Sequence, residues 1–180
     1  MAYVDPPVFV PDTACAASDL NILSADIAFM EAQILADAGC GVSLLRGTNV
    51  SCTTATWTTI SWVSAPIDVG GWWTSGTDIV VPSGLVPAGY SAIAVEIQTA
   101  ARFDANGTGT REIQVLQNGS AVEVPFSTSA ITGDTTPVGA TVWASCVAGD
   151  VLTIQVYQNS GGNLNCNHAN AHVKRIFPIP

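Results

Sequence analysis

From about residue 57 to the C-terminus, short apolar runs alternate with turns, and helical patterns are almost absent. In the run 90–103, Ile93, Val95 and Ile97 share one side of an extended chain, which is the period of two expected for a half-buried strand. Further strands are expected at 56–63, 111–117, 121–124, 138–147, 151–158 and 172–176. Turn chemistry separates these runs, at Pro87-Ala88-Gly89, Asn106-Gly107, Asn118-Gly119 and Ala148-Gly149-Asp150.

Asn118-Gly119 predicts the clearest hairpin, because this pair supplies the positive φ angles of a type I′ turn. Many short strands punctuated by turns are typical of a sandwich or jelly roll. The predicted fold class is therefore all-β: an antiparallel jelly-roll β-sandwich over residues 55–180, preceded by an extended N-terminal arm and one α-helix.

The arm is predicted over residues 1–17, because Pro6, Pro7 and Pro11 exclude a helix there. A helix is expected over 18–39, with Ser18 as the N-cap and Gly39 as the C-cap. Residues 40–54, rich in glycine and small polar residues, are predicted to be a linker. The apolar positions of the arm and the helix are the candidate anchoring residues: Tyr3, Val8, Phe9, Val10, Leu20, Leu23, Ile27, Met30 and Ile34.

The apolar stripe of the helix follows a heptad rhythm over only about two heptads, so two explanations remain open. The helix either forms a coiled coil with copies of itself or packs against the sandwich or a neighbouring subunit.

Charged residues make up only 11% of the chain, whereas a free surface carries about 25–35% of them. Much of this surface is therefore expected to contact other protein. The net charge is −9 with five strong cations, which argues against nucleic acid as a partner. Neither an apolar run of membrane-spanning length nor a signal peptide is present, so we expect assembly in a cytoplasm and no membrane partner.

The order of several landmarks resembles the trimeric jelly-roll domain of the tumour-necrosis-factor family and of complement-type globular heads. These landmarks are an aromatic early strand, Ile79-Val80-Val81-Pro82, Pro87-Ala88-Gly89-Tyr90, Gly109-Thr110-Arg111, Asn118-Gly119 and the run from Ala148 to Gly162. The resemblance implies a homotrimer. A second resemblance, of Ala17–Asn21 and Phe29–Glu31, is to the start of tailed-bacteriophage virion proteins.

Chemistry-bearing clusters are few. Cys166, His168 and His172 would share one phase of an extended strand, which makes them candidate metal ligands, although a polar loop between strands is favoured and no metal is expected. Asp104, Asn106, Asp134 and Asp150 are loop residues of the calcium-binding kind without a calcium-loop spacing.

Cysteines number five in the chain. We expect them to be reduced and buried, with Cys146–Cys166 as the candidate disulfide. The chain carries neither a nucleophile elbow nor a phosphate-binding loop, so we expect no enzyme activity, no catalytic residue and no cofactor.

These observations together predict a structural virion protein. The favoured role is a trimeric capsid decoration, or cement, protein of a tailed bacteriophage, located on the virion surface. It would bind the major capsid protein or other virion proteins through its N-terminal arm and stabilise the shell. The alternative is a receptor-binding tail-fibre tip or head-fibre adhesin, in which exposed Trp72, Trp73 or Tyr157 stack on host glycans.

Overall fold

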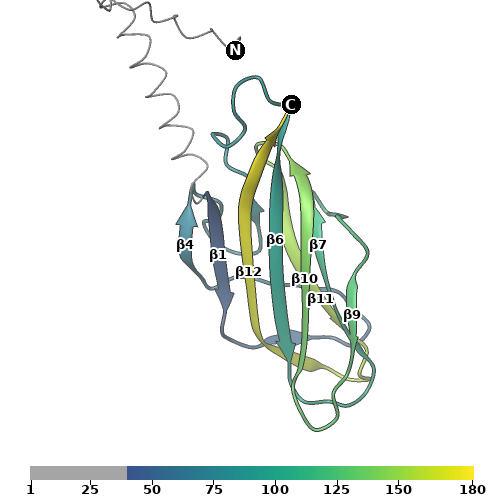
Figure 1. The fold of residues 1–180 in the computed structure, drawn as a ribbon. Helices are drawn as coiled ribbons and strands as arrows, with labels where there is room; N and C mark the ends of the chain where they lie inside the picture. Colours follow the sequence, from purple (N-terminus) through teal and green to yellow (C-terminus); the bar gives the residue numbers. More distant parts are fainter. Residues whose placement is uncertain (1–39) are drawn as a thin grey trace, which may run out of the picture. The chain divides into compact units, whose positions relative to one another are not determined.

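The computed structural model describes residues 40–180, which form an all-β jelly-roll sandwich of two antiparallel sheets (Figure 1). The predicted arm and helix lie outside the described residues. The same holds for every candidate anchoring residue: Tyr3, Val8, Phe9, Val10, Leu20, Leu23, Ile27, Met30 and Ile34. No helix long and apolar enough to cross a membrane occurs within residues 40–180.

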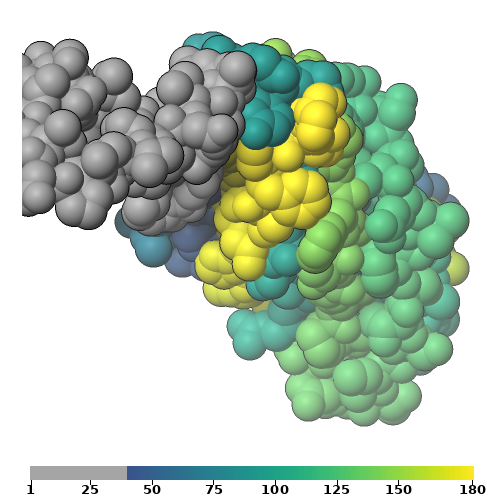
Figure 2. Space-filling view, turned by 45° about the horizontal axis from the view of Figure 1, so that its top comes forward, coloured from purple at the N-terminus to yellow at the C-terminus, as the bar shows by residue number. Residues whose placement is uncertain are grey.

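Sheet A is built around its two longest strands, β6 and β12, which run side by side along the sandwich (Figure 1). The strand order is β10-β6-β12-β1-β4, and β2 pairs with the start of β12. Its strands are β1 (Gly41–Arg46), β2 (Val50–Cys52), β4 (Ser64–Val69), β6 (Ala92–Phe103), β10 (Thr136–Cys146) and β12 (Leu164–Ile179). The space-filling view shows residues of β12, in yellow, at the molecular surface (Figure 2).

Sheet B is centred on β11 and β7. The path runs β3-β11-β7-β8, while β5 pairs with β11 and β9 pairs with β7. Its strands are β3 (Thr58–Thr59), β5 (Ile79–Val80), β7 (Thr110–Gln117), β8 (Ser120–Ala121), β9 (Phe126–Ser129) and β11 (Val151–Gln158).

The core lies between the two sheets and is filled by alternate residues of the long strands. Ile93, Val95 and Ile97 of β6 are fully buried, as their predicted common side requires. In β10 the alternation is complete, because its even-numbered residues are buried and its odd-numbered ones are exposed from end to end. Strand phase therefore decides which side chains reach the two outer faces of the sandwich.

The segment predicted as a linker, 40–54, is part of the sandwich instead. It holds β1 and β2, and β1 pairs with both β12 and β4. Gly41 is needed for packing here, because a Cβ on it would meet the carbonyl oxygen of Val173 in β12. Gly41 therefore reflects the close approach of strands rather than a hinge, whereas Gly47 has open space around it.

The first predicted strand, 56–63, is largely irregular: β3 covers only Thr58–Thr59, and Trp62 makes an isolated bridge to Gly76. The predicted hairpin is confirmed, since Asn118 and Gly119 have φ angles of 52° and 81° between β7 and β8. The strand expected at 121–124 is shorter than predicted, because β8 ends at Ala121.

One cation is fully buried at the start of β7. The guanidinium of Arg111 donates hydrogen bonds to the carbonyl oxygens of Asn106, Thr108 and Thr110, over 2.9–3.0 Å. It also lies 5.7 Å from the ring centroid of Phe103, within range of a cation–π contact. Burial lowers the pKa of Arg111. This side chain ties the β6–β7 loop to the end of the sandwich.

The four cysteines in the described part are buried, as predicted, and Cys52, Cys146 and Cys166 are free thiols. Burial, together with the nearby charge of Asp150, raises the pKa of Cys146 to about 12. Burial is also the main cause that raises the pKa of Cys166, to about 11. A thiolate is the reactive form of cysteine, so these thiols are held unreactive, and the candidate Cys146–Cys166 disulfide is not formed.

Candidate interaction face on sheet A

The outward side of β10, β6, β12 and β1, which we call the sheet A face, is the candidate functional surface. Strand register arranges its side chains in three cross-strand rows. The rows are Trp143–Glu96–Lys174–Gly41, Thr141–Gln98–His172–Ser43 and Gly139–Ala100–Asn170–Leu45. Most of these residues are small or uncharged.

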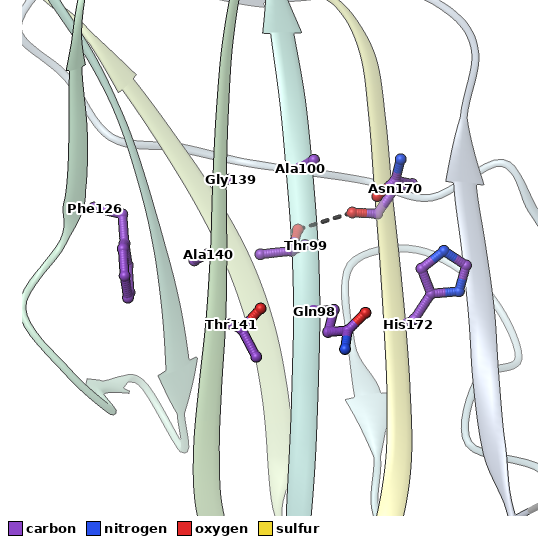
Figure 3. A pocket seen from close by; sticks show the side chains of 9 residues that line it. All are labelled: Gln98, Thr99, Ala100, Phe126, Gly139, Ala140, Thr141, Asn170 and His172. Atoms are coloured by element: carbon purple, nitrogen blue, oxygen red, sulfur yellow. Dashed lines mark hydrogen bonds between the residues drawn. The ribbon is translucent and has the colours of Figure 1, made fainter.

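A shallow groove of about 570 Å³ crosses the middle of this face (Figure 3). Gly139, Ala100 and Ala140 are the smallest residues in its lining, and the ring of Phe126 from β9 stands at one side. Gln98, Thr141, Asn170 and His172 add polar side chains. The hydroxyl of Thr99 donates a 2.8 Å hydrogen bond to the carbonyl oxygen of Asn170, which ties β6 to β12 beneath it. The groove thus offers a flat apolar centre with uncharged hydrogen-bonding groups around it.

Charge on the sheet A face is nearly self-compensated. The ammonium of Lys174 lies 2.9 Å from the carboxylate of Glu96, which also accepts a hydrogen bond from Gln98. The bond from Lys174 is the main cause that lowers the pKa of Glu96. An exposed pair of this kind contributes little to stability, but it leaves the three rows without net charge. Arg102, the next outward residue of β6, adds one exposed cation at the end of the face.

Large apolar side chains are exposed around this face. Phe177 of β12, and Ile67 and Val69 of the edge strand β4, are each about half exposed. The outward face of an antiparallel sheet is normally polar. Exposed apolar groups beside a charge-poor groove therefore mark a surface suited to contact with protein.

Sheet B presents a different outward face. Gln114, Gln155 and Thr59 lie side by side on three strands and form a hydrogen-bonded ladder, with bonds of 2.8 and 3.0 Å. Next to them Trp57 and Tyr157 contact each other, with ring centroids 5.3 Å apart. The ladder of Gln114, Gln155 and Thr59 covers the middle of this face with polar side chains. A polar outward face is what a sheet in contact with water normally presents.

The aromatic residues predicted to stack on glycans are not exposed. Trp72 is fully buried in the core, where its backbone N–H donates to Asp68. Trp73 is half-buried, and its indole N–H donates to the carbonyl oxygen of Gly76. Tyr157 is half-buried against Trp57. The prediction that Trp72 is an exposed platform is wrong, because its indole fills the sandwich.

The exposed tryptophan is instead Trp143, which is 56% exposed on β10. Sequence reasoning missed it, although a signal existed. Trp143 shares its phase with Thr141 and Ser145, while Val142 and Ala144 alternate with it toward the core. A tryptophan on the polar phase of a regular strand points to solvent.

The predicted common phase holds for His168 and His172 but is wrong for Cys166. All three residues lie within β12 rather than in a loop between strands. A β-bulge interrupts the pairing of β12 with β6 between Cys166 and His168. An extra residue moves the following side chains to the other side, so Cys166 is buried in the core while His172 is exposed. Among residues 40–180 no group of three or more His, Cys, Asp or Glu side chains is placed to hold a metal ion.

The candidate calcium ligands also have other partners. Asp104 accepts hydrogen bonds from the amides of Asn165 and Asn167. Asp150 accepts from Gln117, Asn118 and the backbone N–H of Val147, and so orders a turn, as predicted. Neutral donors thus occupy the oxygens that a calcium ion would need.

The fold resembles those of several solved structures. The chain is similar to the globular domain of zebrafish complement 1qA, with a TM-score of 0.54, 10% identity, and coverage of 78% of this chain and 99% of that chain. Murine APRIL gives a TM-score of 0.53, 15% identity, and coverage of 74% and 97%. The PRD1 vertex protein gives a TM-score of 0.52 and 18% identity, with coverage of 76% of this chain and 96% of that chain.

No family model and no curated protein matches this sequence. At such low identities the structural likeness bears on the fold alone. The chain shares its jelly-roll fold with these domains, as the landmarks in the sequence predict.

Proposed function

We propose that the protein is a trimeric structural protein of a virion, and that it decorates the capsid of a tailed bacteriophage. The sheet A face carries the trimer contacts, and the segment 1–39 carries the attachment to the shell. The resemblance of residues 17–31 to phage virion proteins supports the location. The similarity in fold to the PRD1 vertex protein is consistent with it.

The observation that carries this proposal is the contrast between the two outer faces. The sheet A face has a flat groove over Ala100 and Gly139, one compensated ion pair and exposed apolar residues beside it. Sheet B carries a hydrogen-bonded ladder of polar side chains. Closed rings are built from one patch that meets a different patch on the next subunit, so an asymmetric sandwich suits a cyclic trimer.

Decoration stabilises a capsid by mass action. A ligand that binds only the assembled shell lowers the free energy of that shell by RT ln(1 + [L]/Kd), which is about 2.7 kcal/mol at a hundredfold excess over Kd. A trimer adds multivalency, because three attachment segments bind as one unit and the second and third contacts are intramolecular. No catalytic group is required.

The trimer is tested by native mass spectrometry of the full chain and of Ala100→Glu. Ala100 lines the groove, so a carboxylate there is expected to convert the trimer to monomer. The matched control is Thr153→Glu, on the outward face of sheet B, which is expected to remain trimeric. Full-length protein that is monomeric at micromolar concentration would contradict the proposal, and so would an unchanged trimer in Ala100→Glu.

Attachment is tested with bare capsids. Purified protein is expected to saturate them, and a variant lacking residues 1–17 is expected to stay folded and trimeric but to lose binding. Full binding by the truncated protein would contradict the role of the arm. Binding to host cells, without binding to capsids, would favour the fibre-tip alternative.

A further inference from the structure

A second groove lies between the β7–β8 hairpin and β10, on a different part of the molecule from the groove in the sheet A face. It is about 580 Å³ in volume, and the exposed indole of Trp143 forms one side. Gln117, Asn118 and Ser120 of the hairpin line it together with Ser145 of β10. We call it the hairpin groove. In the first cross-strand row the ion pair of Glu96 and Lys174 lies beside Trp143, toward the centre of sheet A.

The polar groups of the hairpin groove are held in place by a buried carboxylate. Asp150, only 9% exposed, accepts hydrogen bonds of 2.8 Å from the side-chain amides of both Gln117 and Asn118. Gln117 also donates 2.9 Å to the carbonyl oxygen of Ser145, and Asn118 accepts 2.9 Å from the backbone N–H of Val151. The two amides are therefore fixed before any ligand arrives, which lowers the entropic cost of binding.

These bonds leave specific groups available. Both amide hydrogens of Gln117 are used, so its side-chain oxygen remains as an acceptor, and the hydroxyls of Ser120 and Ser145 make no hydrogen bond within the described residues. The groove thus combines one exposed aromatic face with an acceptor and two groups that both donate and accept. Sugar rings are complementary to these groups, because they have an apolar C–H face that can stack on an aromatic ring and a rim of hydroxyls that donate and accept hydrogen bonds.

We propose that the hairpin groove binds a neutral saccharide, with a hexose ring stacked on Trp143 and its hydroxyls bonded to Gln117, Ser120 and Ser145. Charge selects the class of sugar. The lining holds no Lys or Arg, a carboxylate lies beneath it, and the whole chain carries −9, so sialylated, sulfated or phosphorylated glycans are disfavoured. The site goes beyond the proposed decoration role and gives the particle a contact to cell-surface sugars.

The test uses saturation-transfer difference NMR of the full chain with methyl glycosides of glucose, galactose, mannose and N-acetylglucosamine. N-acetylneuraminic acid is the anionic comparison. We expect transfer to at least one neutral glycoside and none to the acid. Trp143→Ala should weaken that binding roughly tenfold or more, the size of loss typical when an aromatic anchor is truncated. Tyr90→Ala, which removes another exposed aromatic ring, should leave it unchanged.

Several results would overturn the proposal. They are no transfer to any neutral glycoside, equal binding by Trp143→Ala, or binding of the acid alone. The alternative partner of Trp143 is a second copy of the chain, which native mass spectrometry of Trp143→Ala tests. Loss of the trimer in this variant would show that Trp143 faces that second copy. Failure of the saccharide test leaves capsid binding intact, so it is distinguishable from failure of the decoration role.

Discussion

Replacement of Asp150 by asparagine is expected to destabilise the sandwich measurably, although it changes no volume. One carboxylate oxygen accepts from Asn118, and the other accepts from both Gln117 and the backbone N–H of Val147, each over 2.8 Å. In Asp150→Asn an amide nitrogen takes the place of one carboxylate oxygen. Because the amide nitrogen is a donor and faces another N–H donor, it cannot accept a hydrogen bond. At least one hydrogen bond is lost, and the others lose their charge.

The magnitude follows from these contacts. A hydrogen bond to a charged group contributes about 1.5–3 kcal/mol, roughly twice a neutral one. Loss of one such bond, with weakening of the rest, predicts a decrease of about 2–3 kcal/mol in the free energy of unfolding at neutral pH. This is a large fraction of the ~5–15 kcal/mol that stabilises a typical domain, so it is well within reach of measurement.

The effect should depend on pH with a definite sign. Burial tends to raise the pKa of Asp150, but the bonds from Asn118, Val147 and Gln117 outweigh it and lower the pKa below its ordinary value of 3.8. A lowered pKa means that the carboxylate stabilises the fold fully above the unfolded-state pKa, and that this contribution is lost as the pH falls through the folded-state pKa. The difference in the free energy of unfolding between wild type and Asp150→Asn should therefore become smaller below about pH 4.

Urea unfolding followed by tryptophan fluorescence, at one fixed protein concentration, measures this difference. Asp134→Asn is the matched control, because Asp134 is exposed and its side chain bonds only to neighbouring Thr135. A loss below about 0.5 kcal/mol, within the range of ordinary surface substitutions, would refute the role given to Asp150. An equal difference in the free energy of unfolding at pH 7 and pH 3 would refute the electrostatic part of the reasoning.

Three further predictions concern a buried cation, two glycines with positive φ angles and a buried thiol. Arg111→Met should cost about 3 kcal/mol in urea unfolding, because it leaves carbonyl oxygens buried without donors, and Arg111→Lys should recover part of this loss. Gly109→Ala should destabilise by more than about 2 kcal/mol, since its φ is +78° and a Cβ would meet Asn159. Gly119→Ala, with φ of +81° but open space, should cost only about 1 kcal/mol by the same assay. Cys146, whose pKa burial raises to about 12, should resist iodoacetamide in native protein and react in urea, as peptide mass mapping would show.

The sequence was sufficient for the regular part of this fold because strand phase and turn chemistry are local. The alternation in β6 and the Asn118-Gly119 pair each identify their element without knowledge of the rest of the chain. β1 was mistaken for a linker because the reason for Gly41 is tertiary: the approach of Val173, more than a hundred residues away in the chain, excludes a Cβ. The sequence around Gly41 alone therefore predicts a flexible linker.

The candidate sites were harder to predict for two physical reasons. A bulge in β12 between Cys166 and His168 reverses the phase of the residues that follow it, up to a second shift after Arg175, so Cys166 and His172 end on opposite sides of the sheet. Trp72 follows two glycines in an irregular segment, where no periodicity tells a buried ring from an exposed one. Trp143 lies in a strand without bulges, and there the phase alone predicts its exposure.

The two proposed surfaces meet along one strand. β10 is an edge strand of sheet A, and Gly139, Thr141 and Trp143 all point outward from it; Gly139 and Thr141 line the face groove, whereas Trp143, further along the strand, lines the hairpin groove. Edge strands that expose a large aromatic ring invite association, so such a ring is retained where it has a partner. The buried carboxylate of Asp150 distinguishes the two kinds of partner. A ring that only packs against another protein copy has no need of two amides fixed beside it, whereas a sugar with hydroxyls at defined positions does. Asp150→Asn should therefore weaken saccharide binding at Trp143 while the trimer persists, and a parallel loss of both would assign Trp143 to the subunit contact.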